Sequence, residues 1–295
     1  MPLGIKPTVD FAFKKIFGSP ENSLALMGLL NAILDLKHPI VAVDIKNPFS
    51  YQEFAESKLI VLDIRCRDSS GRWLNVEMQV SVYGGLLERL VYYACSMYTD
   101  ELSAGGNYAT LQPAISICLL NHQIFPGTQA DHRFQMVDLA SGRKLAKAIE
   151  VHTLELTKYN LDERSISRAS KLEQWAFLLL LAQDYDVDQL KALLPGIEFE
   201  QAIETIETIS FKTEDKLMYD QREKAQRDYE WALSGAREEG LEEGMEKGKL
   251  TGTIQTLQEL LGDEVSSDSD LKPRSIAELT AELSALQTRL RRRDA

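Results

Sequence analysis

Two adjacent apolar segments joined by a short polar turn constrain the fold of this chain most. The segments, residues 58–67 and 73–82, have the length of β-strands, and the turn between them has the sequence Ser-Ser-Gly at residues 69–71. Apolar and polar residues alternate along the second segment. Successive side chains of a strand point to opposite faces, so Glu77 and Gln79 are expected side by side, together with Trp73, Asn75 and Ser81 and opposite Leu74, Val76, Met78, Val80 and Val82.

The turn predicts which residues of the two strands lie opposite each other. A three-residue loop, with a type I turn followed by Gly71 in the left-handed region, pairs Asp68 with Arg72 and Asp63 with Glu77. Directly opposed residues have Cβ atoms about 5 Å apart, close enough for two carboxylates to bind one cation. A loop of two or four residues would shift the pairing by one residue and separate the carboxylates onto different faces.

The expected pairing of Asp63 with Glu77 has two interpretations. Two carboxylates in apolar strands repel each other and are costly to desolvate, and a hard divalent cation such as Mg2+ removes both costs. The alternative is structural, because Lys58, Arg65 or Arg89 could form ion pairs with the same carboxylates. The pattern alone leaves both open. The four histidines lack paired ligand spacing, so no zinc site is expected, and no Walker A motif indicates an ATPase.

The elements expected around the hairpin indicate an α/β fold. A helix over residues 21–36, a strand over 40–46, the two hairpin strands, a helix over 86–103 and a strand over 114–122 follow in that order. This order predicts a mixed sheet flanked by helices. Residues 133–145 suggest a further hairpin, residues 149–156 a strand, and the chain from Ser165 onward helices.

The C-terminal half differs from the N-terminal half in charge and pattern. Of the net charge of -12, residues 1–150 contribute -1 and residues 151–295 contribute -11. Small residues recur every four positions from Ala232 to Gly252, which indicates either a helix-packing seam or a weakly stable solvated helix. Ser275 and Glu278 form a capping box, and the chain beyond them carries a coiled-coil spacing of Ile276, Leu279, Leu283, Leu286 and Leu290. We therefore expect a homo-oligomer that forms through the C-terminal helices.

Composition also restricts location and partners. The three cysteines form no close pair, the N-terminus has no apolar signal segment, and no apolar run could span a membrane, so we expect a reduced cytoplasmic protein without membrane contact. The overall acidity argues against non-specific coating of DNA, although it does not exclude a local DNA-binding groove.

Several ordered segments resemble one family. DFAFKKIFG at 10–18, LLNAILD at 29–35, KLIVLDI at 58–64, NVEMQ at 75–79, RLVYYACSMY at 89–98 and GGNYATLQPAISICLLN at 105–121 are similar to the PD-(D/E)XK nuclease superfamily. More narrowly, they resemble the bacterial recombination-promoting nuclease (Rpn) family of transposase-like proteins. The resemblance implies an α-β-β-β-α-β nuclease-like core with a helical, coiled-coil-like C-terminal extension. We expect a nuclease-like domain at 1–160, a helical subdomain at 161–212, a charged glycine-spaced helix at 213–262, and a linker with a short coiled-coil helix at 263–295.

The resemblance also implies roles for individual residues. Asp63 and Glu77 match the metal-binding carboxylates, and the backbone carbonyl of Met78 is implied as a third ligand of Mg2+, with Mn2+ or Ca2+ as alternatives. Gln79 stands where the superfamily usually has lysine and can orient water only by hydrogen bonds. A positive charge must then come from elsewhere, with Lys58 and Arg89 as candidates. Asp10 and Tyr93 are second-rank candidates; Asp10 could instead cap a short helix, and Tyr93, four residues after Arg89, could serve packing alone.

The implied function is metal-dependent hydrolysis of DNA phosphodiester bonds by an endonuclease that promotes recombination or accompanies mobile elements. The alternative is a non-catalytic, nuclease-like DNA-binding or assembly module of a transposon-related system. The seam of leucines favours this alternative, and the presence of both Asp63 and Glu77 opposes it.

Overall fold

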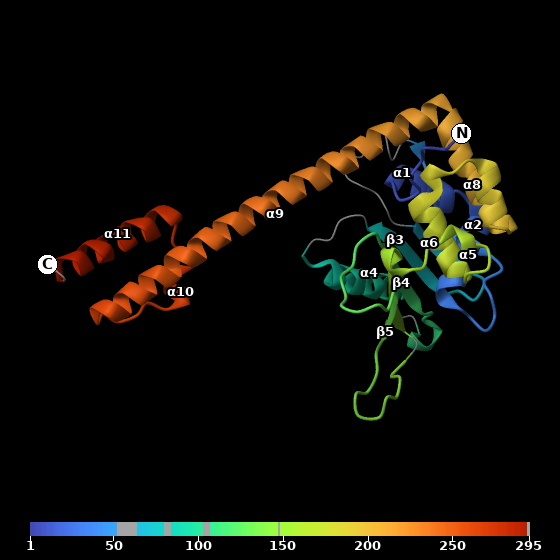
Figure 1. Ribbon diagram of the computed structural model, residues 1–295. Helices are drawn as coiled ribbons and strands as arrows, with labels where there is room; N and C mark the ends of the chain where they lie inside the picture. The colour runs from blue at the N-terminus through green and yellow to red at the C-terminus, as the bar shows by residue number, and fades with distance from the viewer. Residues whose placement is uncertain (52–63, 80–83, 103–106, 147, 294–295) are drawn as a thin grey trace. The chain divides into compact units, whose positions relative to one another are not determined.

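A computed structural model describes residues 1–51, 64–79, 84–102, 107–146 and 148–293 of the chain (Figure 1). The chain divides into two compact units, residues 1–226 and residues 227–295. Helix α9, Thr213–Leu261, contributes to both units.

One mixed sheet organises the first unit. Among the described residues its strand order is β1-β2-β3-β4-β6-β5. The strands β3, β4 and β6 run parallel, and the other neighbouring pairs are antiparallel. This arrangement confirms the predicted α/β class. The strands are β1 Val43–Ile45, β2 Ile64–Asp68, β3 Trp73–Gln79, β4 Ala114–Leu120, β5 Asp131–Gln135 and β6 Ile149–Glu155.

The hairpin of β2 and β3 has the predicted register. Ile64 lies opposite Val76, and the Asp68 amide donates to the Arg72 carbonyl at 3.1 Å. Gly71 has a φ of +83°, the left-handed conformation that the three-residue loop requires. Asp63 lies outside the described residues, so its predicted pairing with Glu77 remains a prediction.

Helices cover both faces of the sheet. The apolar residues of β3, among them Leu74 and Val76, pack in the main core with the helices α1 and α2. The opposite face packs through Cys118 and Leu120 of β4 against α4. The helices of the first unit that precede α9 are α1 Asp10–Gly18, α2 Ser23–Leu34, α4 Leu86–Asp100, α5 Glu163–Ile166, α6 Lys171–Leu181, α7 Val187–Leu193 and α8 Ile197–Phe211. Short 3-10 turns lie at Pro20–Asn22, Tyr108–Thr110, Leu156–Lys158 and Ala182–Asp184.

The helices after β6 share the main core with α1 and α2. The ring centroid of Trp175 in α6 lies 4.4 Å from that of Phe199 in α8, in a tilted contact, and 5.6 Å from that of Phe17 in α1, in an edge-to-face contact. Gly28 allows α2 to pack closely against α8, since an added Cβ at residue 28 would lie 2.7 Å from the Cβ of Glu198. Residues 161–212 and the strands therefore belong to one compact unit.

Buried polar contacts tie the start of α9 to α1. Asp10 is 2% exposed and forms an ion pair with Arg222 of α9, whose Nε donates to the Asp10 Oδ2 at 2.9 Å. Lys15 pairs with the fully buried Asp215 at 2.6 Å. Asp10 is the first residue of α1 and not its cap, since Val9 occupies the N-cap position. Each charge in a site with little water needs its opposite charge as a partner, because water cannot solvate it there. These two ion pairs therefore join α1 to the start of α9.

The second unit is a helical hairpin. It contains the end of α9, the short helix α10 Asp268–Leu271 and α11 Ile276–Arg293. Ser275 and Glu278 form the predicted capping box, in which the Glu278 amide donates to the Ser275 Oγ at 3.3 Å and the Ser275 amide donates to the Glu278 Oε2 at 2.8 Å. The leucines expected to form a coiled-coil seam pack within the chain, in a cluster of Ile254, Leu257, Leu271, Leu279 and Leu286.

The small-residue ridge of α9 has no packing partner among the described residues. At Gly240, Gly244, Gly248 and Gly252, nothing lies within 4 Å of an added Cβ. In the described part of the chain the ridge is therefore a solvated helix surface. No helix that the structure describes is both long and apolar enough to cross a bilayer.

Candidate active site on strand β3

Glu77 lies on the face of the sheet that α4 covers. Its neighbours in the parallel register are Cys118 of β4 and, one strand further, Thr153 of β6. Paired residues of neighbouring strands share a face, and Cys118 belongs to the apolar cluster that includes Leu90 of α4. The Glu77 side chain is only 3% exposed. The period of two therefore places this carboxylate in a nearly water-free position, which ordinarily requires hydrogen-bond donors around it.

Among the described residues, three side chains provide such donors. The Asn75 Nδ2 donates to Glu77 Oε1 at 2.9 Å, and the Gln79 Nε2 donates to Glu77 Oε2 at 3.3 Å. The Arg89 Nη2 lies 3.4 Å from the same Oε2 and forms an ion pair with it. These contacts hold the Glu77 carboxylate between two amides of its own strand and one cation of α4.

Arg89 reaches Glu77 from the first turn of α4. Gly85, with a φ of +84°, precedes the helix, and the Arg89 amide donates to the Gly85 carbonyl at 3.0 Å. The guanidinium lies 5.8 Å from the centre of the Tyr93 ring, one helical turn later. The predicted neighbours Arg89 and Tyr93 therefore do share a face. Tyr93 is linked to Glu77 only through Arg89, whose guanidinium contacts the Tyr93 ring.

The floor of the site is apolar and contains a protonated thiol. Burial raises the pKa of the Cys118 thiol strongly, and the negative charge of Glu77 raises it further, while Arg89 opposes the shift. A neutral thiol is a poor metal ligand. The ligands that the described site can offer a cation are therefore oxygens, the Glu77 carboxylate and main-chain carbonyls such as that of Met78, a donor type that suits a hard ion such as Mg2+. Among the described residues no group of three or more His, Cys, Asp or Glu side chains could hold a metal ion.

The predicted site residues divide into four groups. Glu77, Gln79 and Arg89 lie together, with Tyr93 beside Arg89. The side chain of Met78 is buried in the main core on the opposite face. Asp10 has Arg222 as its ion-pair partner. Lys58 and Asp63 lie outside the described residues.

Asn75 is a contact of Glu77 that the sequence interpretation did not single out. It is 1% exposed, and its amide oxygen has no hydrogen-bond partner among the described residues. The signal was available in the sequence, because the alternation already placed Asn75 on the face of Glu77 and Gln79. A polar residue two positions before a buried carboxylate on the same strand is a candidate for its hydrogen-bond donor.

The comparisons with known proteins identify the family of the chain. No curated protein and no solved structure matches the chain. The model of the PD-(D/E)XK nuclease family transposases matches residues 7–236. This range covers more than half of the chain and runs from before α1, through the strand of Glu77 and Gln79, into α9. As its resemblance to that superfamily implied, the chain belongs to the PD-(D/E)XK nuclease family transposases.

Proposed function

We propose that this protein is a metal-dependent DNA endonuclease that promotes recombination or the mobility of genetic elements. Membership of a nuclease family supports hydrolysis of a phosphodiester bond. The observation that carries the proposal is the buried Glu77 carboxylate, contacted by Asn75, Gln79 and Arg89 on one face of the sheet. Any buried carboxylate needs such donors, and in a member of a nuclease family the same donors would fix the orientation that a metal ligand requires.

Glu77, Asp63 and the Met78 carbonyl are the residues proposed to hold Mg2+, or Mn2+ or Ca2+ in its place. When bound, such a cation supplies the acidity that makes water nucleophilic and the positive charge that phosphate oxygens require. Asn75 orients the Glu77 carboxylate from one side. Gln79 is neutral, so its part is to orient a nucleophilic water by hydrogen bonds.

In the superfamily, a lysine usually stands at the position of Gln79 and supplies a positive charge. In this chain Arg89 supplies that charge instead. Its guanidinium is permanently charged and presents several donors, of which one contacts Glu77. A planar guanidinium suits a phosphate oxygen, whose charge increases in the transition state. Tyr93 holds the guanidinium in place through its ring.

The test is relaxation of supercoiled plasmid DNA by the full chain in Mg2+. We expect wild-type protein to nick the plasmid, and Asp63→Ala and Glu77→Ala to fall below detection. Glu88→Ala removes an exposed carboxylate of α4 next to Arg89 and serves as the matched control, with unchanged nicking. Circular dichroism of each variant establishes that it is folded.

Equal nicking by wild type and both variants would assign the activity to a contaminant and reject the proposal. Absence of nicking by the wild type, with DNA binding retained, would instead favour a non-catalytic DNA-binding module. Chelation by EDTA followed by addition of Mg2+ or Mn2+ tests the metal directly, because activity must disappear and return.

A further inference from the structure

A preordered β-hairpin arm projects from the sheet between β5 and β6. The arm comprises residues 136–146, and Figure 1 shows it extending beyond the end of the sheet. Val137 and Lys144 form a β-bridge, and the Leu145 amide donates to the Met136 carbonyl at 3.1 Å. The arm is therefore a short hairpin whose two sides are joined by one β-bridge.

The tip of the arm is held by Asp138. Its carboxylate accepts hydrogen bonds from the Ala140 amide at 2.9 Å and from the Ser141 Oγ at 2.6 Å. These bonds hold the pKa of the Asp138 carboxyl below its ordinary value, the Ser141 hydroxyl contributing most. The Gly142 amide closes the turn by donating to the Asp138 carbonyl at 2.8 Å. The chain thus specifies the shape of the tip by itself.

This ordered segment leaves its apolar side chains in water. Leu139 is 95% exposed and Leu145 is 79% exposed, and Met136 and Val137 are each exposed by more than two fifths. A segment that serves only to connect two strands usually carries polar residues at such positions. Preordering without burial indicates that the arm is formed for a partner.

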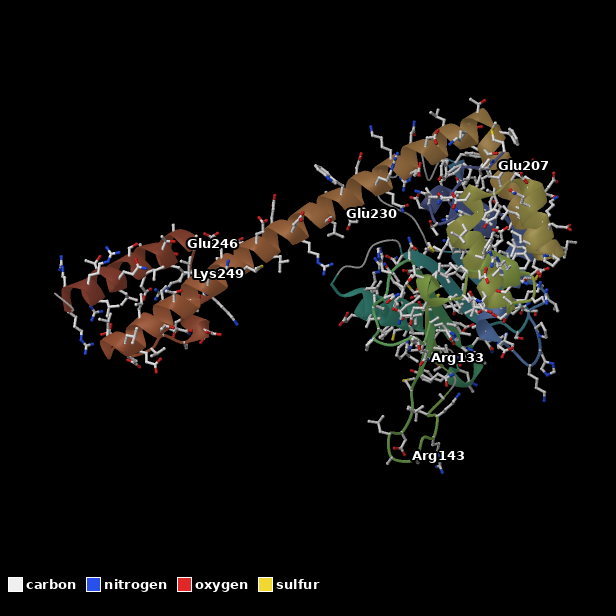
Figure 2. The ribbon with its side chains drawn as sticks, in the orientation of Figure 1. Arg133, Arg143, Glu207, Glu230, Glu246 and Lys249 are labelled. Carbon is white, nitrogen blue, oxygen red and sulfur yellow. The ribbon has the colours of Figure 1, made fainter. Side chains whose placement is uncertain are left out.

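Both faces of the arm carry a cation beside an apolar residue. Val137 and Lys144 share one face because they are bridge partners. Met136, Leu145 and Arg143 lie on the other face, since successive side chains alternate and the Asp138 amide donates to the Arg143 carbonyl at 2.9 Å. Figure 2 shows Arg143 near the far end of the arm, distant from Arg133 at its base. The positive charge is therefore not confined to one side.

We propose that the arm enters a groove of duplex DNA. The major groove admits a two-stranded β-ribbon, and its walls are two phosphate backbones, one on each side. Arg143 and Lys144 would each face one wall, while Leu139 at the tip contacts base edges. The inference rests on the proposed function, because that function makes DNA the substrate.

A second copy of this chain fits the arm less well than DNA. Protein interfaces bury one face of a ribbon and are depleted in lysine, whereas this arm presents a cation on each face. The charge balance points the same way. The whole chain carries -12, yet residues 136–146 contain two basic residues and one acidic residue, Asp138. The arm thus complements a polyanion better than it complements its own protein.

The position of the arm suits a duplex that also reaches Glu77. In the register of the sheet, the root of the arm at Ile149 lies four residues along β6 from Thr153, which is on the row of Glu77. That is about 13 Å along the strands and about 10 Å across two strands. Six more residues separate Ile149 from Arg143, so Arg143 lies no more than about 35 Å from Glu77, within the length of a duplex of one to two turns.

The experiment measures binding of the full chain to a fluorescent duplex of 30 base pairs, by anisotropy in EDTA and over a range of salt concentrations. In Arg143→Ala/Lys144→Ala we expect binding to weaken about 5- to 20-fold, and the slope of log K against log salt to decrease by about 1.8, for two lost phosphate contacts. Leu139→Ser is expected to weaken binding about 2- to 5-fold without changing the slope, because no charge is lost. Binding to the corresponding single strand should change less than twofold.

The matched control is Arg164→Ala/Arg168→Ala, which removes two exposed cations near α5. Arm variants that bind duplex within twofold of this control would overturn the inference, and so would an equal loss on single strands. Arm variants that change the sedimentation mass but not DNA binding would assign the arm to a second copy of the chain. Plasmid nicking separates the two proposals. If DNA binding depends on the arm but the wild type does not nick the plasmid, only the proposed endonuclease activity is rejected. If the wild type nicks the plasmid but the arm variants bind DNA as well as wild type does, only the DNA-binding role of the arm is rejected.

Discussion

The ion pair of Asp10 with Arg222 supports a prediction about two residues 212 positions apart. Both side chains are buried, at 2% and 8% exposure, and the Arg222 Nε lies 2.9 Å from the Asp10 Oδ2. Asp10→Asn keeps the volume but removes the negative charge that Arg222 contacts. Breaking a buried pair in this way costs about 3–5 kcal/mol of unfolding free energy. At about 2–4 °C per kcal/mol for a unit of this size, the melting temperature should fall by about 6–20 °C.

The double variant Asp10→Asn/Arg222→Met removes both charges and should recover much of this loss, since a buried pair can be replaced by neutral groups at small cost. Urea unfolding followed by circular dichroism gives the coupling energy, which we expect to be at least about 2 kcal/mol. Additive losses would refute the ion pair as the reason for the burial of Asp10.

Plasmid nicking by the same variants tests whether Asp10 has any catalytic part. Asp10 matches a family position, so a role in the active site was one of its two interpretations. If Asp10 serves only to join α1 to α9, the double variant nicks DNA as well as wild type at a temperature where both are folded. A stable but inactive double variant would contradict the structural interpretation and assign Asp10 to the site.

Three further predictions concern stability. Burial raises the pKa of the Glu155 carboxyl, but hydrogen bonds from Lys158 and two backbone amides outweigh it, so the pKa lies below its ordinary value of 4.5. The contribution of the Glu155 carboxylate to the free energy of unfolding is then fully present above about pH 4.5 and is lost as the pH falls through its lower pKa in the folded protein. Glu155→Gln should therefore lower the free energy of unfolding by about 2–4 kcal/mol at pH 7, and urea titrations at acid pH should show a progressively smaller loss. Gly28→Ala places a Cβ 2.7 Å from that of Glu198 and should cost about 1–3 kcal/mol in urea unfolding; a neutral result would show that α2 and α8 can separate freely. Leu279→Ala should destabilise the second unit by about 2–5 kcal/mol, seen as faster hydrogen exchange over residues 254–290 with residues 1–226 unchanged, and exchange that stays slow would contradict its packing in the helical hairpin.

The sequence was most informative where the relevant physics is local. The alternation of β3 and the Ser-Ser-Gly turn predicted the hairpin and its register, which the described residue pairs confirm. Both signals act within about twenty residues. The arrangement of Glu77 beside Gln79 followed from the period of two alone. Asn75 obeyed the same rule, and it was overlooked only because an amide was not weighed as a donor to Glu77.

The C-terminal leucines show where sequence interpretation was incomplete. Their spacing predicts a seam, and α11 does present that seam, but the spacing does not specify which helix covers it. In the structure the covering surface is the end of α9 in the same chain, through Ile254 and Leu257. The short connection between α9 and α11 makes the intrachain partner available at a high effective concentration. The observation that suggested self-association is therefore accounted for within one chain, and a homo-oligomer is a prediction without structural support from this seam.

The sequence by itself determined the α/β class, the hairpin with its register, and the face on which Glu77 and Gln79 lie. Each follows from strand periodicity or turn geometry, which neighbouring residues impose on one another. Only the tertiary structure decided that Arg89 of α4 meets Glu77, that Asp10 meets Arg222, and that the arm stays unburied. These contacts join elements distant in the sequence, and they depend on how whole helices pack on the sheet, a property that no local pattern encodes.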